Sequence, residues 1–217
     1  MRGITIVLNG KSVHTGNDLD LVQEEKDLGK PRVQSYTVEV PGRHGLLNLT
    51  KGLTGEVVYS NRTLRFQYFG SGKRSDLLEL DAAFSQYHGE TVQIIDDDYP
   101  EDYFEGEVEV STKIHGNYIT IQLTVNAQPF RFARTETKVT RAVSSDFNIV
   151  YQIDNPGVSV VPTVTVTGEV KVTMNNVSYT LSAGTYISEE LTLRRGLNAF
   201  TLSGDGTISF SYRRRDI

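Results

Sequence analysis

Acidic side chains form the densest group of potentially reactive residues in this 217-residue sequence. Eight carboxylates lie between Asp96 and Glu109, and no Lys or Arg interrupts them. Carboxylates bind Ca²⁺, and a pair of them can supply the acid and base of a hydrolase. A calcium loop, however, needs acidic residues at alternate positions and a glycine at its sharp bend, whereas Asp96, Asp97 and Asp98 are consecutive and lack that glycine. The spacing argues against a metal site, and a hydrolase that depends on Asp97 is the least favoured of three function hypotheses.

Three of these carboxylates have the spacing of a strand face. Glu105, Glu107 and Glu109 alternate with Val108 and Val110, so the glutamates share one face of a strand and the valines share the other. This pattern is typical of a strand surface that faces water or a channel. We expect the three glutamates to line the interior of an oligomer and to repel DNA there.

The rest of the sequence lacks the spacing of a catalytic or nucleotide-binding motif. The segment FGSGKRS resembles a phosphate-binding loop superficially, but the positions that need Gly and Ser or Thr are occupied by Gln67 and Arg74. The four histidines are separated and have no partner at helical spacing; they are His14, His44, His88 and His115. Cysteine is absent, which excludes thiol nucleophiles, thiolate metal sites and disulfides. We therefore expect a protein that is not an enzyme and that needs no metal or cofactor.

Charge is distributed unevenly along the chain. Residues 1–133 carry 13 basic and 19 acidic side chains (net −6), and residues 134–217 carry 9 and 8 (net +1), which gives −5 in total. A nucleic-acid-binding surface needs clustered Lys and Arg. The one dense basic cluster is Arg213, Arg214 and Arg215. We interpret this cluster as a solvated tail or a strand end held by ion pairs, and we expect no specific binding of DNA.

The N-terminal sequence predicts neither secretion nor membrane insertion. Its apolar run of about five residues is broken by Asn9 and Gly10, too short for a signal peptide. No stretch approaches the roughly 18 apolar residues that a membrane span requires. We expect the protein to be made in the cytoplasm.

Alternation with a period of two dominates the first 133 residues. Residues 108–114 and 119–125 each have one apolar face, and the turn signal His115-Gly116-Asn117 between them predicts a long hairpin. Asn9-Gly10 predicts a second hairpin turn after the strand ITIVL, and QSYTVEV (34–40) predicts a strand before Pro41. The first part of the chain is therefore predicted to be mainly β.

One helix interrupts this pattern, over about residues 75–88. Ser75 is the expected N-cap, and Gly89 is the expected residue after the helix. Apolar residues recur at spacings of three and four and include Leu77, Leu80, Phe84 and Tyr87. Such a helix is expected to pack on an open sheet face or to close the mouth of a barrel.

A polar stretch after Ala133, ARTETKVTRAVSSD, is interpreted as a linker or arm that begins a second domain. The domains are therefore placed at 1–133 and 134–217. Beyond the linker, short alternating strands are separated by turn signals at Asn155-Pro156-Gly157, Asn175-Asn176, Arg195-Gly196 and Gly204-Asp205-Gly206. About six or seven such strands are expected to form a small β-sandwich. The fold class is thus all-β, or mainly β with one helix.

A block near the N-terminus joins a strand, a tight turn and a second strand. It comprises residues 38–50 (VEVPGRHGLLNLT), then Gly55, Val58-Tyr59 and the segment 61–66 (NRTLRF). Pro41 and Gly42 favour a tight turn, and Gly45 permits a positive φ angle. Arg43 and Arg62 offer planar forks suited to buried or inter-subunit carboxylates. This block resembles the N-terminal signature of the siphophage distal tail proteins.

A second block lies in the C-terminal part. It comprises Asn155-Pro156-Gly157, residues 162–168 (PTVTVTG), residues 195–198 (RGLN) and residues 204–213 (GDGTISFSYR). This block resembles the galectin-like C-terminal domain of the same family. Both blocks occur in the family's order, with the helix and the acidic strand between them, so the resemblance covers nearly the whole chain.

The resemblance implies an N-terminal domain, sandwich-like or barrel-like, that assembles side by side into a hexameric hub ring coaxial with the tail tube. DNA and the tape-measure protein would pass through its lumen. The galectin-like sandwich would lie at the periphery, where a tail-associated tip protein or receptor-binding proteins can attach. The protein would therefore be made in the bacterial cytoplasm and be found in the virion at the tail tip, next to the tail tube protein.

These expectations identify candidate sites. The candidates for the ring interface are Pro41, Gly42, Arg43, His44, Gly45 and Arg62, with the 108–125 hairpin and the polar segment after Ala133. The candidates for the lumen are Glu105, Glu107 and Glu109. The second hypothesis, from another class, is a carbohydrate-binding module that recognises host cell-wall glycans. The lack of Trp weakens it, and we expect Tyr179, Tyr186 and Tyr212 to serve packing rather than sugar stacking.

Overall fold

The computed structural model describes residues 2–50 and 56–217, so Gly55 of the N-terminal block lies outside the described residues. Antiparallel strands dominate this range, and α2 (Arg74–Ser85) packs among them. The mainly β fold class is therefore confirmed. The chain divides into two compact units, Met1–Arg131 with Ile217, and Phe132–Asp216.

The main sheet of the first unit is antiparallel and open. Its strands run in the order β2-β1-β9-β10-β11-β8-β3. Their bounds are β1 (Ile4–Leu8), β2 (Lys11–His14), β3 (Val22–Asp27), β8 (Arg62–Ser71), β9 (Thr91–Asp96), β10 (Asp102–His115) and β11 (Tyr118–Ala127). Among the described residues the end strands β2 and β3 pair only with β1 and β8, so the sheet does not close into a barrel.

Both hairpins predicted from turn residues are confirmed. Strands β1 and β2 meet at Asn9 and Gly10, whose φ angles of 52° and 79° are those that a two-residue hairpin turn needs. Strands β10 and β11 pair from Gly106–Ala127 to His115–Tyr118. Because side chains alternate along a strand, this register places Val108 and Val125 on the same face of the sheet.

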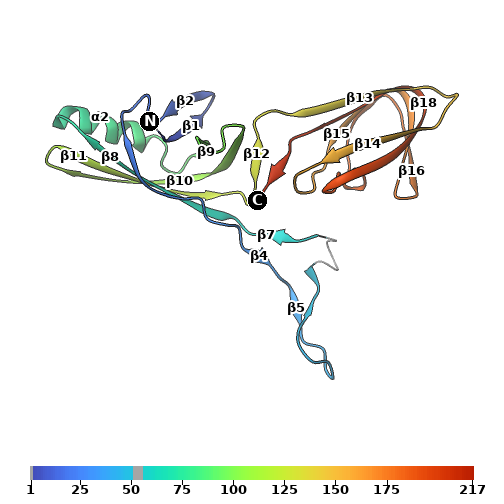
Figure 1. Cartoon of the computed structure of the whole chain (residues 1–217), viewed down its shortest axis with the longest axis horizontal. Coiled ribbons are helices and arrows are strands. Elements are labelled where there is room, and N and C mark those ends of the chain that lie inside the picture. The colour runs from blue at the N-terminus through green and yellow to red at the C-terminus, as the bar shows by residue number, and fades with distance from the viewer. Residues whose placement is uncertain (1, 51–55) are drawn as a thin grey trace. The chain divides into compact units, whose positions relative to one another are not determined.

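Helix α2 covers one face of the sheet (Figure 1). Leu77 and Phe84 are fully buried against β11 residues such as Ile121, and these side chains form the core of the unit. The predicted N-cap at Ser75 is wrong: Lys73 occupies the N-cap without a capping hydrogen bond, and the Ser75 hydroxyl donates to Asp76 Oδ1. The opposite face of the sheet has mostly polar side chains, together with the Phe69 and Tyr118 rings, whose centroids are 5.3 Å apart.

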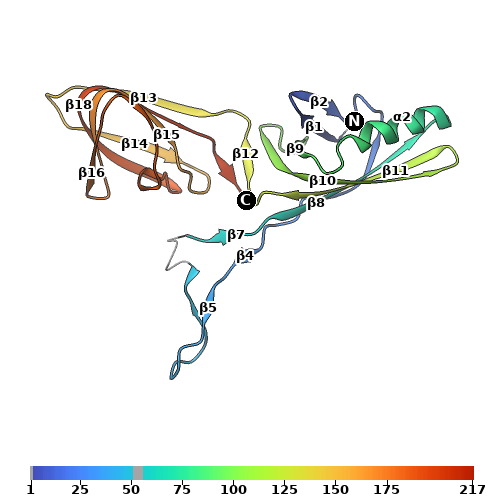
Figure 2. The ribbon, with the colours of Figure 1, turned by 180° about the vertical axis from the view of Figure 1, so that it is seen from behind.

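Residues 33–59 contain four short strands outside the main sheet. They are β4 (Val33–Gln34), β5 (Thr37–Val38), β6 (Leu47–Asn48) and β7 (Val58–Tyr59). β4 pairs with β7 and β5 with β6, so the segment is a two-stranded ribbon (Figures 1 and 2). The continuous strand predicted for residues 34–40 is wrong, because no third strand lies beside this ribbon within the described range to extend its pairing. We call residues 30–50 and 56–60 the ribbon.

The second unit is built on two long strands. After β12 (Arg131–Ala133) its elements are β13 (Thr137–Val143), β14 (Ile149–Asn155), β15 (Thr163–Met174), β16 (Val177–Leu181), β17 (Gly184–Ile187), a 3₁₀ turn (Glu189–Leu191), β18 (Gly196–Tyr212) and β19 (Arg215–Asp216). The order β13-β18-β15-β16 is completed by β14 beside β18 and β17 beside β15. The polar stretch expected to be a linker forms β13, because its hydrogen bonds to β18 need no apolar side chains.

The predicted turn at Gly204-Asp205-Gly206 is wrong, because β18 continues through it. Gly168 of β15 lies opposite Gly206, with φ angles of 79° and 151°. A Cβ atom at Gly206 would lie 1.8 Å from the Thr167 carbonyl oxygen, so this crossing requires glycine. The Phe200 and Phe210 rings, from the two ends of β18, have centroids 4.9 Å apart. The paired strands β15 and β18 thus bend at Gly168 and Gly206 and contribute to both layers of the sandwich.

Candidate functional site

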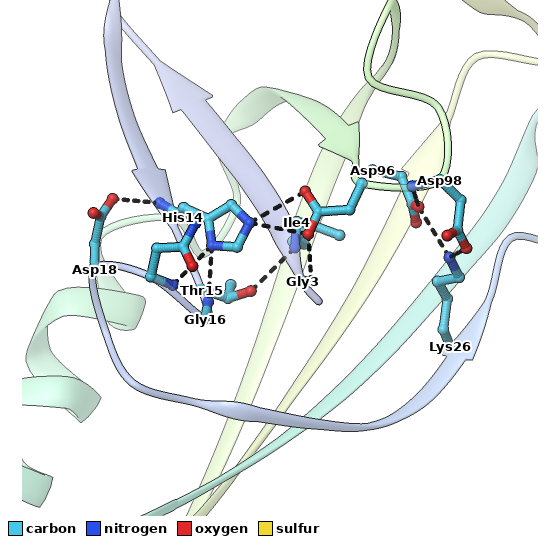
Figure 3. A network of polar contacts seen from close by, with 11 residues as sticks. Gly3, Ile4, His14, Thr15, Gly16, Asp18, Lys26, Asp96 and Asp98 are labelled. Carbon is cyan, nitrogen blue, oxygen red and sulfur yellow. Dashed lines mark hydrogen bonds and ion pairs between the residues drawn. The ribbon is translucent and has the colours of Figure 1, made fainter. Parts of the chain in front are cut away.

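The acidic triplet 96–98 is tied to the strands around it (Figure 3). Asp96 is 1% exposed, and its Oδ1 accepts hydrogen bonds from Lys26 Nζ at 2.9 Å and from the Asp98 amide at 2.8 Å. Lys26 Nζ also donates to Asp98. The lysine of β3 thus joins two carboxylates beyond the end of β9. We call Lys26, His14 and residues 96–98 the clasp.

Asp97 holds the other side of the clasp. Its Oδ2 accepts the Gly3 amide at 2.9 Å, and the His14 Nε2 atom lies 3.2 Å away. His14 Nδ1 accepts the amides of Gly16 and Asn17 at 3.1 and 2.9 Å. Because Nδ1 is an acceptor, Nε2 carries the proton and donates to Asp97. The imidazole is held at both nitrogens and is a structural link between β2 and the 96–98 turn.

The electrostatics of the clasp agree with this structural role. Burial disfavours the charge of Lys26, but its hydrogen bonds to Asp98 and Asp96 and their charges outweigh burial and raise its pKa. The hydrogen bond and the charge of Lys26 lower the pKa of Asp98. Among the described residues, no group of three or more His, Asp or Glu side chains is arranged to hold a metal ion. The carboxylates of the clasp stabilise the fold.

The three glutamates predicted to share a strand face do so on β10. Glu105 is half-buried and accepts a hydrogen bond from Gln128 Nε2 at 2.9 Å. Glu107 and Glu109 are exposed and line a hollow of about 260 Å³ with residues of β8 and β11. Neither forms an ion pair among the residues that the structure describes. Unlike the clasp, these two carboxylates remain available to a partner.

Arg62 lies at the root of the ribbon and is buried rather than displayed. Its Nε donates to the Leu28 carbonyl at 3.0 Å, its Nη2 donates to the Gly29 carbonyl, and its guanidinium lies 5.0 Å from the Phe104 ring centroid. Burial and the neighbouring charge of Arg131 lower its pKa. Arg62 therefore fixes the path of the chain as it enters the ribbon. Because the side chain is buried, it would act on an interface only by setting this path.

The turn residues Pro41, Gly42, Arg43, His44 and Gly45 lie together and are exposed at the end of the ribbon. Gly42 and Gly45 have φ angles of 81° and 77°, as the turn signal predicts.

Residues 32–50 include no buried side chain. Val33, Tyr36 and Leu46 are 56%, 62% and 63% exposed. A ribbon with apolar side chains in water and no core of its own is typical of a segment that packs on another molecule.

The motif residues of the second unit hold its turns together. The Asn155 side chain donates to the carbonyls of Val158 and Leu193, and the Asn198 side chain accepts from the Arg194 amide at 2.8 Å. A Cβ atom at Gly157 would lie 2.4 Å from the Arg215 carbonyl oxygen. The fold of the second unit therefore requires Asn155, Gly157 and Asn198 of the second sequence block.

The basic cluster near the C-terminus is also used within the unit. Arg213 donates to the carbonyls of Ala133 and Arg134, Arg215 donates to that of Ser159, and Arg214 lies 3.1 Å from Asp216. The interpretation as a strand end is confirmed, although backbone carbonyls contribute more contacts than carboxylates.

The aromatic residues considered for sugar stacking pack on the core. Tyr212 is 6% exposed, and Tyr179 and Tyr186 pack against the same hydrophobic cluster. The expectation that these rings serve packing is confirmed.

Sequence reasoning missed two sets of residues. Lys26 and His14 are separated from their aspartates by 70 and 83 positions, so only the folded sheet brings them together. Lys30, Arg32 and Arg65 line a hollow of about 430 Å³ beside the ribbon root. Arg65 is 33 positions from Arg32 in the sequence, so only the pairing of the strands reveals this cluster.

Comparisons with known proteins identify the fold. No family model matches the sequence, and no curated protein is significantly similar to it. The crystal structure of the SPP1 Dit (gp 19.1) protein, described as a paradigm of the hub adsorption apparatus in phages that infect Gram-positive bacteria, superposes with a TM-score of 0.61. That match covers 97% of this chain and 98% of that chain at 14% sequence identity. The phage P2 baseplate, in its activated conformation with Ca, matches with a TM-score of 0.48 and 8% identity over 99% of this chain and 98% of that chain. The resemblance found in the sequence is therefore confirmed at the level of the fold.

Proposed function

We propose that this chain is a structural protein of a phage tail tip, a distal tail protein whose copies form a hub ring between the tail tube and the adsorption apparatus. The fold shared with the SPP1 Dit protein over nearly the full length of both chains supports this assignment. The feature of this molecule that carries the proposal is the ribbon. It has the composition of an interface and lacks the packing of a domain.

The energetics of the ribbon support an assembled state. A two-stranded ribbon is at best marginally stable alone, and ordering each residue costs about 1–2 kcal/mol of conformational entropy. With no buried side chain among residues 32–50, the ribbon gains little hydrophobic stabilisation within its own chain. Contact with a neighbouring copy would supply it. Pro41, Gly42, Arg43, His44 and Gly45 would then lie against that copy, while Arg62 sets the direction of the ribbon.

The exposed glutamates fit the lumen of such a ring. Glu105, Glu107 and Glu109 lie on the sheet face opposite the core. A negative surface would let DNA and the tape-measure protein pass without binding, because phosphates and carboxylates repel each other.

The proposed ring is a hexamer that contacts the tail tube protein on one side and a tail-associated tip protein or receptor-binding proteins on the other. Its place is the virion tail tip, after synthesis in the cytoplasm of the host bacterium. No helix among the described residues is long and apolar enough to cross a membrane. The proposed function is to form a ring of defined geometry in the tail tip, and no reaction is assigned to the chain.

Negative-stain microscopy and light scattering of the purified protein test the proposal. We expect six-fold rings with a central hole. The matched variant replaces Val33, Tyr36 and Leu46 by Ser; it should keep its circular dichroism spectrum and melting temperature and fail to assemble. A strict monomer at high concentration, both alone and with purified tail tubes, would overturn the ring.

A further inference from the structure

The outer face of the main sheet has acidic side chains on β10 and a group of basic side chains near the ribbon root, and we call these two regions its charged edges. One row of paired residues runs from Glu109 on β10 through Thr124 on β11 and Arg65 on β8 to Asp27 on β3. The pairing of β9 with β10 ends at Thr91–Glu107, and beyond it the turn after α2 lies beside β10, because Val108 forms backbone hydrogen bonds with Gly89 and Glu90. Neighbouring strands are about 4.8 Å apart. The row is therefore four strands wide, with Glu109 at one end and Arg65 beside Asp27 at the other.

Basic side chains gather at the other edge. Lys30, Arg32 and Arg65 are exposed and line one hollow of about 430 Å³ together with Asp27. Within the described part of the chain, none of the three forms an ion pair. Asp27 is engaged locally, because its Oδ1 accepts the Gly29 amide at 2.8 Å. The hollow itself therefore has three exposed cations and one carboxylate, although Glu24 and Glu25 are exposed farther along β3.

Between the edges the face is uncharged. Thr124 and Asn126 of β11 and Thr63 of β8 separate the glutamates from the arginine. The two charged edges thus stay about two strands apart within one copy, and no ion pair joins them among the described residues.

A ring built by side-by-side addition requires two different, complementary surfaces on each subunit. We infer that Glu107 and Glu109 of one copy pair with Lys30, Arg32 and Arg65 of the next copy, across the seam between adjacent sheets. This inference rests on the proposed ring and refines its lumen: Glu107 and Glu109 would lie where a seam opens onto the lumen, paired with cations of the next copy instead of repelling DNA as unpaired charges. It names the contacts that align neighbouring sheets and set the direction in which copies follow one another.

The occupant of the basic edge is a second copy rather than DNA. DNA binding needs a continuous positive surface along the phosphates, whereas these three cations form one local group that includes Asp27. The same chain also displays two exposed, unpaired carboxylates at the opposite edge. Complementary charges of this kind mainly raise association rates and specify the partner.

Paired charge reversals test the inference. Variant A carries Glu107→Lys and Glu109→Lys, and variant B carries Arg32→Glu and Arg65→Glu. Each alone places like charges at every seam, so at low salt we expect assembly at least about tenfold weaker than wild type by analytical ultracentrifugation. An equimolar mixture should assemble again, with A and B in a 1:1 ratio by native mass spectrometry. A single chain with all four reversals should also assemble.

Controls separate this result from misfolding and from net charge. Glu79→Lys with Glu101→Lys changes the net charge as variant A does, at exposed positions of the same unit outside both charged edges, and should assemble like wild type. Equal melting temperatures of A, B and wild type would show that each folds. Normal rings from A and B would overturn the seam contact and leave the ring intact. The same conclusion would follow if variant B assembled normally and differed from wild type only by weaker binding to DNA. A wild-type monomer under all conditions would overturn the ring itself.

Discussion

The carboxylates of the clasp and those of Glu107 and Glu109 are close in sequence but differ in their surroundings. Asp96 is buried, and its Oδ1 accepts two hydrogen bonds, whereas Glu107 and Glu109 are exposed and unpaired within the described residues. A buried charge that loses its partner destabilises the fold, while an exposed charge contributes little to it. The comparison separates acidic residues that are engaged in the fold from those that are free for the proposed assembly.

The largest expected effect comes from removing the cation of the clasp. Lys26→Met leaves the Asp96 carboxylate buried without its ion pair, which should lower the free energy of unfolding by about 3–5 kcal/mol. Urea unfolding measures the loss. The double variant Lys26→Met with Asp96→Asn should recover part of it, because the uncompensated charge is gone. A loss below about 1 kcal/mol in the single variant would place the clasp among ordinary surface ion pairs.

Lys26 and Asp98 give the clasp a pH dependence. Because the pKa of Lys26 is raised on folding, its contribution is present below about pH 10.4 and is lost as pH rises through the folded pKa. Because the pKa of Asp98 is lowered, its contribution is present above about pH 3.9 and is lost as pH falls through the folded pKa. The urea midpoint of wild type and that of Lys26→Met are measured from pH 3 to 11. Their difference should be constant at intermediate pH and should decrease at both ends of the range. A constant difference would contradict it.

Turn residues and alternation predicted the local structure correctly where the two paired strands are adjacent in the sequence and form one hairpin. Asn9-Gly10 and the 108–125 hairpin are examples, because their register depends on neighbouring residues. The strand expected at 34–40 and the turn expected at 204–206 failed for a different reason. Both depend on which distant strand lies alongside, and Gly206 is needed for its close approach to Thr167 rather than for a turn. The clasp could not be predicted for the same reason.

An intermediate effect is expected at the root of the ribbon. Arg62→Lys keeps the charge but loses the fork that reaches both Leu28 and Gly29, which should cost about 1–2 kcal/mol. Amides of residues 30–34 should exchange hydrogen faster. Arg65→Lys is the matched control, because Arg65 is exposed and its side chain forms no hydrogen bond within the described range. Equal exchange in the two variants would show that Arg62 does not position the ribbon.

The smallest effect on folding is expected where the carboxylates are open. Glu107→Gln with Glu109→Gln removes two charges that have no partner in their own chain, so the free energy of unfolding should change by less than about 0.5 kcal/mol. Asp97→Asn, the control within the clasp, replaces a carboxylate oxygen that accepts the Gly3 amide or the His14 imidazole, and should destabilise by about 1 kcal/mol or more. Assembly should show the reverse order, with the glutamine variant weakened and Asp97→Asn unchanged at temperatures where it is folded. If both variants lost stability equally, the separation between folding and assembly carboxylates would fail, because the open glutamates would then be part of the fold.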